Sequence, residues 1–148
     1  AGLATLDVTR MLRLVHESKA NIVTPAFVNT CWDCAQTEAR MVSIAKAGTR
    51  TGVHGTGGML CQTGEPMCEF QLPHRDCRYR YTNLVEVSFP LIKPVALRKV
   101  LGACDQCMPN RHSTWGLNRV WCIAAATDSG ARGKSCAIID ETPILHYN

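Results

Sequence analysis

Nine cysteines in a chain of 148 residues constrain the fold of this protein more than any other feature of its sequence. Thiols in that number would be open to oxidation in an oxidising compartment. Either most of them pair as disulfides in a secreted protein, or about four of them bind a metal ion in a reducing compartment, or most of them stay as free, buried thiols. We expect the first, with up to four disulfides in an extracellular protein or one of the secretory-pathway lumen. The cysteines stand at positions 31, 34, 61, 68, 77, 104, 107, 122 and 136.

The odd number of cysteines has a consequence of its own. At least one cysteine must stay outside any pairing within the chain. It is either a buried thiol, which is common for cysteine, or one half of a disulfide to a second chain. The spacing of the cysteines leaves their connectivity and the oligomeric state open.

Length and composition exclude several classes of protein. A chain of 148 residues is one domain by size, and its 46% hydrophobic and 19% charged residues exclude a disordered segment. Its apolar runs are far shorter than the ~20 residues of a membrane span. The net charge of +4 and the pI of about 8.6 stay short of the pI above ~9 that is typical of nucleic-acid-binding domains. We therefore expect no membrane span and no nucleic-acid partner.

Helical periodicity appears in three segments. Residues 5–19 predict an amphipathic helix capped by Asp7, with Val8, Met11 and Val15 among its spaced apolar residues. Residues 31–47 predict a second helix, and residues 94–102 a short third one that Pro94 begins. Between the first two, residues 21–27 look extended, although Pro25 argues against a central strand.

The second half of the chain predicts strands. Residues 81–92 have β-type composition, and residues 118–126 and 135–140 resemble two strands of a hairpin with a long loop. Cys122 and Cys136 lie near the two arms, where facing positions allow a disulfide. The composite is α+β: a single compact, disulfide-stabilised domain over residues 1–148, with two or three helices packed on a small antiparallel sheet. The Gly-rich residues 48–66 form a loop inserted in this domain.

Two CxxC pairs offer alternative chemistries. Cys31 and Cys34 open a predicted helix, where the helix dipole lowers a thiol pKa and favours a thiol–disulfide oxidoreductase. Asp33 between them opposes that thiolate. Cys104 and Cys107 form the second pair, and four thiolates together would suit a zinc ion in an intracellular accessory subunit of a larger complex. The ~70 residues between the pairs exceed the spacing of familiar zinc modules.

A run of arginines and tyrosines over residues 74–81 is the predicted binding surface. Arginine and tyrosine are enriched among the residues that dominate protein interfaces. The competing interpretation is a solvated strand edge that turns Arg78 and Arg80 outward and Tyr79 and Tyr81 inward. The candidate binding residues are His74, Arg75, Arg78, Tyr79, Arg80 and Tyr81.

The pattern favours a binding protein over an enzyme. The five histidines are scattered, no G-x-S-x-G is present, and the Gly-rich stretch after His54 lacks the lysine of a phosphate-binding loop. We therefore expect no catalytic residues, no metal site and no cofactor. The expected function is a secreted ligand, effector or subunit that contacts a protein partner, which the mild positive charge predicts to be acidic. Its contact surface would include loop 48–66 and run 74–81.

Overall fold

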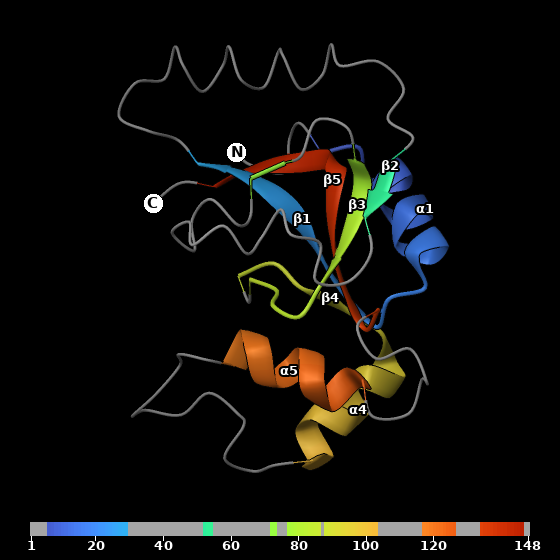
Figure 1. The fold of residues 1–148 in the computed structure, drawn as a ribbon, viewed down its shortest axis with the longest axis vertical. Coiled ribbons are helices and arrows are strands. Elements are labelled where there is room, and N and C mark those ends of the chain that lie inside the picture. Colours follow the sequence, from blue (N-terminus) through green and yellow to red (C-terminus); the bar gives the residue numbers. More distant parts are fainter. Residues whose placement is uncertain are drawn as a thin grey trace.

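A computed structural model describes residues 6–29, 52–54, 72–73, 77–86, 88–103, 117–126 and 134–146. In these parts the chain forms three helices and five strands (Figure 1). The helices are α1 (Val8–Ser18), α4 (Pro94–Ala103) and α5 (Leu117–Ala126). The strands are β1 (Ile22–Asn29), β2 (Gly52–His54), β3 (Cys77–Thr82), β4 (Leu91–Ile92) and β5 (Cys136–His146).

The strands form one sheet in the order β2-β3-β5-β1-β4. β5 runs parallel to β1 and antiparallel to β3, β2 runs parallel to β3, and β4 runs antiparallel to β1. The predicted α+β class is confirmed, while the sheet is mixed and not antiparallel. That residues 1–148 form one domain with loop 48–66 as an insertion stays a prediction.

Helix α1 follows the signals in its sequence. The Asp7 side chain accepts a hydrogen bond from the backbone N–H of Arg10 at 2.9 Å, which satisfies one of the unpaired donors of the first turn. Met11 and Leu14, three residues apart, are both buried, and Leu14 packs against residues of the sheet. The helix ends where Lys19 adopts a left-handed conformation with φ 57°. The helix predicted over residues 5–19 is therefore confirmed within a few residues at each end.

The two helices of the second half differ in how well the sequence predicted them. α4 begins at Pro94, as expected of a proline at the first helical position. The strand predicted over residues 118–126 is wrong, because this segment is helix α5. Its buried residues Cys122 and Ala125 are three apart, and Ile123 between them is 62% exposed. This spacing is helical, and three consecutive alanines favour a helix further.

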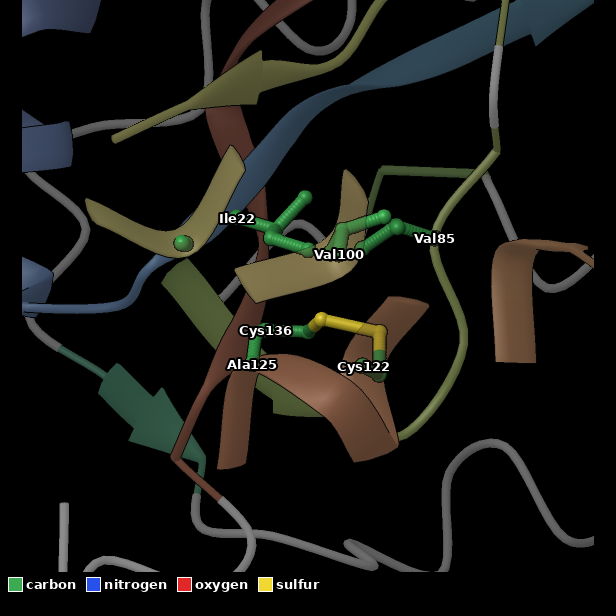
Figure 2. Close-up of a cluster of buried hydrophobic side chains, with 7 residues drawn as sticks. Ile22, Val85, Val100, Cys122, Ala125 and Cys136 are labelled. Atoms are coloured by element: carbon green, nitrogen blue, oxygen red, sulfur yellow. A yellow bond between two sulfur atoms is a disulfide. The ribbon is translucent and has the colours of Figure 1, made fainter. Parts of the chain in front are cut away.

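Two clusters of buried side chains flank the sheet. The first joins α4, α5 and the sheet and consists of Ile22, Val85, Ala96, Val100, Cys122, Ala125 and Cys136 (Figure 2). The second lies beneath α1 and consists of Leu14, Ala20, Val23, Tyr79, Ala137 and Ile139. Neighbouring residues of β1 and β5 divide between the clusters, because successive side chains of a strand point to opposite faces. β1 and β5 are thus covered on both faces and form the centre of the fold.

The extended segment at residues 21–27 is confirmed as β1, but its position differs from the prediction. β1 lies between β5 and β4, inside the sheet, despite Pro25. β4 pairs with Ile22 and Val23 alone among the described residues. Pro25 itself pairs with Ile139 of β5, on the other side of β1. The missing N–H of Pro25 is therefore tolerated, since no β4 residue of the ladder stands opposite it.

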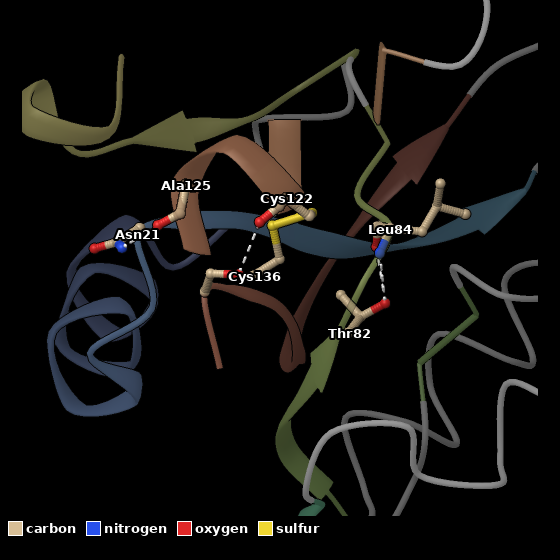
Figure 3. The surroundings of a disulfide bond; sticks show 7 residues. Asn21, Thr82, Leu84, Cys122, Ala125 and Cys136 are labelled. Atoms are coloured by element: carbon tan, nitrogen blue, oxygen red, sulfur yellow. Dashed lines mark hydrogen bonds between the residues drawn. A yellow bond between two sulfur atoms is a disulfide. The ribbon is translucent and has the colours of Figure 1, made fainter. Parts of the chain in front are cut away.

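The strand predicted over residues 81–92 is also wrong in extent. β3 ends at Thr82, whose hydroxyl donates to the carbonyl of Leu84 at 2.9 Å and accepts from its N–H at 3.1 Å (Figure 3). Such a side-chain bond competes with a strand ladder and turns the chain. Val85 then enters the core outside any strand, and β4 begins after Pro90.

Several predictions lie outside the described residues. They are the helix over residues 31–47, most of loop 48–66, and the hairpin loop over residues 127–134 apart from Lys134. Of loop 48–66, the structure describes the backbone of β2. Among the helices that the structure describes, none combines the length and the apolar character that crossing a bilayer requires.

Candidate functional site

The described part of the arginine–tyrosine run, residues 77–81, belongs to strand β3, which lies between β2 and β5 and is no edge of the sheet. Tyr79 and Tyr81 share the face beneath α1, and their rings meet edge to face with centroids 5.7 Å apart. The Tyr81 hydroxyl donates to the carbonyl of Ser18 at 2.9 Å, where α1 ends. Lys134 lies over the Tyr81 ring, with Nζ 5.4 Å from the ring centre. Both tyrosines thus attach α1 and its C-terminus to the sheet.

The environment of Tyr79 disfavours its ionised form. Burial raises the pKa of the Tyr79 phenol above its ordinary value of 10.0, and the neighbouring Tyr81 and the Glu17 carboxylate raise it further. The Arg78 charge acts in the opposite direction and lowers this pKa. A phenol held neutral in this way serves packing and hydrogen bonding.

Arg80 is buried and forms an ion pair with Asp140 of β5. Its Nε lies 3.0 and 2.9 Å from the two carboxylate oxygens, and its Nη2 lies 2.9 Å from Oδ1. The same Nη2 donates to the carbonyl of Leu72 at 2.9 Å. The side chains are 6% and 0% exposed. The interpretation that turned Arg80 out to solvent is therefore wrong, because a carboxylate inside the protein holds its guanidinium there.

Arg78 belongs to a second, partly exposed group of charges. Its two Nη atoms donate to the two carboxylate oxygens of Glu17 at 2.6 and 2.5 Å, and its Nε lies 3.7 Å from Glu141. Glu141 also accepts a hydrogen bond from Arg10 of α1. The four side chains link α1, β3 and β5. Each exposed pair of this kind contributes at most about 1 kcal/mol.

Asp140 and Glu141, which bind Arg80 and Arg78, come from an irregular stretch of β5. Pro25 of β1 pairs with Ile139, and Phe27 pairs with Ile144, so four residues of β5 stand where β1 has one. Asp140 and Glu141 lie in this bulge and bind different arginines. Bulges commonly re-aim side chains in this way. Sequence reasoning missed both acids, although two consecutive acids directly after a buried apolar run were a signal for them.

The disulfide joins Cys122 of α5 to Cys136 of β5, with Cα atoms 5.7 Å apart (Figure 3). The two residues are 3% and 0% exposed. Next to it the Ser135 hydroxyl donates to the carbonyl of Cys122 at 3.0 Å, and Asn21 Nδ2 donates to the carbonyl of Ala125 at 3.0 Å. The bond from Asn21 satisfies one of the four carbonyls at the end of α5 that have no partner within the helix. The predicted pair is confirmed, but it links a helix to a strand and not two arms of a hairpin.

Most of the remaining predicted site residues lie in parts of the chain that the structure does not describe. His74 and Arg75 lie outside the described residues, and so do the CxxC cysteines at positions 31, 34, 104 and 107 on which the zinc and oxidoreductase alternatives rest. Cys77 is buried at the start of β3. Within the described ranges, no three histidine, cysteine or acidic side chains are grouped so that they could hold a metal ion.

No protein-family model, no curated protein and no solved structure matches this chain. What the chain does must therefore be argued from its own residues. The described part of run 74–81 binds other parts of the same chain: Arg80 and Tyr79 in the interior, Arg78 and Tyr81 to α1. Of these four side chains, Arg78 and Tyr81 keep a partly exposed surface that a partner could touch.

Proposed function

We propose that this protein is a disulfide-stabilised binding domain of the extracellular space or the secretory-pathway lumen. It would act through contacts with a protein partner, as a ligand, an effector or a subunit of an assembly. The observation that carries the proposal is the buried disulfide between α5 and β5. Bridges of this kind persist in oxidising compartments and are rare where thioredoxin and glutathione keep thiols reduced.

The place of the disulfide supports a structural role for it. Both sulfur-bearing residues belong to the core cluster that α4 and α5 form with the sheet. A redox-active pair needs a sulfur that a thiolate can reach, whereas Cys122 and Cys136 are almost fully buried. A bridge so placed stabilises the protein throughout its life and takes no part in exchange with a substrate.

The net charge of +4 supports an acidic partner. Complementary charge raises the association rate and excludes like-charged partners more than it raises affinity. The partly exposed parts of Arg78 and Tyr81 remain candidates for this contact, together with the predicted residues His74 and Arg75.

The proposal can be tested by producing the same chain in two compartments of one cell type. Directed to the secretory lumen, the protein should be folded and resistant to protease, and C122S/C136S should lose that resistance. Ile123→Ser changes an exposed residue of α5 without touching the bridge, so it should leave the resistance unchanged. Equal protease resistance of cytosolic protein with reduced thiols and one bound zinc ion would contradict the proposal and favour the zinc-stabilised alternative.

A further inference from the structure

Helix α4 exposes apolar side chains on a face that the core does not use. Ala96 and Val100 are its buried residues and pack in the cluster of Figure 2. Leu97 and Leu101 are 40% and 45% exposed, and they are four residues apart. Residues with this spacing lie one above the other along a helix, so the two leucines form a ridge. Apolar side chains that stand together at a protein surface often belong to an interaction site.

The same helix is strongly biased in charge. Residues 91–103 contain Lys93, Arg98 and Lys99 and no acidic residue, and Arg98 is exposed between the two leucines in sequence. Over residues 91–126, which include α5, the sequence has five basic residues and one acidic residue, Asp105. The other residues of the chain contain 11 basic and 11 acidic residues. Residues 91–126 therefore carry a net charge of +4, equal to that of the whole chain, and three of their five basic residues (Arg98, Lys99 and Arg119) belong to α4 and α5.

We propose that α4 docks an amphipathic helix of a partner protein that carries aspartate or glutamate beside its apolar residues. The Leu97–Leu101 ridge fits the groove of a facing helix, and acidic residues along that groove would meet Arg98. This inference rests on the proposed function, because it adds a second contact surface, separate from Arg78 and Tyr81, and the partner chemistry to that binding role.

Two other occupants fit the surface less well. A lipid surface is usually met by helices with tryptophan or phenylalanine on the apolar face, and α4 contains no aromatic residue. A second copy of this chain, docked face to face through α4, would bring like charges together. An acidic protein helix satisfies both the ridge and the charge.

The disulfide makes this face a rigid platform. α5 is bound covalently to β5, and α4 packs on α5 within the same core cluster. A surface that is already ordered loses little conformational freedom when a partner binds, which favours affinity.

Synthetic peptides test the proposal directly. The probes are three peptides of about 18 residues, long enough to form a helix: leucine and glutamate at amphipathic helical spacing, the same peptide with lysine for glutamate, and a scrambled sequence of the first. We expect saturable binding of the acidic helix alone, measured by calorimetry, with NMR shift changes centred on the α4 amides. This binding should weaken as the salt concentration rises.

Matched variants then locate the site. L97S/L101S should weaken binding of the acidic peptide about 30-fold, since it removes two half-exposed leucines from the contact. The control variant V8S/L12S replaces two apolar side chains of α1 that are also four residues apart and are each 50% exposed. It should leave the affinity for the acidic peptide unchanged. Arg98→Glu should weaken binding, while Arg13→Glu on the exposed surface of α1 should have no comparable effect.

Several results would overturn the proposal. They are the absence of saturable binding of the acidic peptide, equal binding of the basic or scrambled peptide, and equal loss of affinity in the α1 variants. Adsorption to vesicles of phosphatidylserine and phosphatidylcholine without peptide binding would assign the face to a membrane. Concentration-dependent dimerisation abolished by L97S/L101S would assign it to a second copy. In each case an intact Cys122–Cys136 bridge would leave the proposed function standing, whereas a chain with all thiols reduced would reject that function itself.

Discussion

At the scale of single residues, Arg78 and Arg80 are two positions apart in sequence but differ in how deeply their charged groups are buried. Arg80 has its guanidinium inside the protein against Asp140, whereas Arg78 lies in a partly exposed network with Glu17 and Glu141. A buried ion cannot regain water when its partner is removed, but an exposed one can. The two pairs should therefore respond very differently to the loss of the acidic partner.

Asp140→Asn tests this difference. It removes the carboxylate charge that faces the buried Arg80 guanidinium, so we expect the free energy of unfolding to fall by about 3–5 kcal/mol. Glu17→Gln is the matched control at the exposed pair and should cost less than about 1 kcal/mol. Urea unfolding monitored by circular dichroism measures both. Equal, small losses in the two variants would contradict the buried ion pair.

Tyr79 predicts a pH dependence of stability. The pKa of Tyr79 is raised above 10.0 in the folded protein, so as the pH rises past 10 the unfolded chain loses this proton before the folded protein does. Loss of the proton lowers the free energy of the unfolded state more than that of the folded state, so the free energy of unfolding falls. Stability should be fully present below pH 10 and fall as the pH rises beyond it. Tyr79→Phe should make that fall shallower, which urea unfolding between about pH 8 and pH 11 would show. The same slope in both proteins would contradict the raised pKa.

At the scale of elements, α1 and α4 were predicted correctly because the residues that specify where they begin lie next to them in the sequence. Asp7 caps α1 and Pro94 begins α4, each within one turn of the helix that it specifies. The sequence predicts a strand where α5 forms, because a short apolar segment does not reveal its period until the buried positions are known. The pairing of β5 with β1 joins residues more than 100 positions apart, and no local pattern indicates it.

The bridge between α5 and β5 makes a prediction about these elements. Its removal in C122S/C136S should cost about 3 kcal/mol, the value expected for a closed loop of this length. Because the bridge holds α5, amide hydrogen exchange should accelerate most in α5, while α1, on the other face of the sheet, keeps its relative protection. Uniform acceleration in both helices would show that the bridge has no local role.

At the scale of the whole molecule, the α+β class and the Cys122–Cys136 pair were predictable, but the candidate site was not. The spacing of Arg78, Tyr79, Arg80 and Tyr81 indicated an alternating strand, yet the bulge in β5 supplies a buried carboxylate that reverses the expected place of Arg80. A bulge depends on the register between distant strands. A sequence read segment by segment contains no information on that register.

The central claim, that the mature protein carries oxidised sulfur in its core, is tested most directly by mass spectrometry of non-reduced, alkylated protein digested with trypsin. Cleavage after Arg119, Arg132 and Lys134 yields residues 120–132 and 135–148, each with a single cysteine. We predict that these two peptides are found joined through Cys122 and Cys136 and separate after reduction. Recovery of both peptides alkylated without reductant would contradict the account.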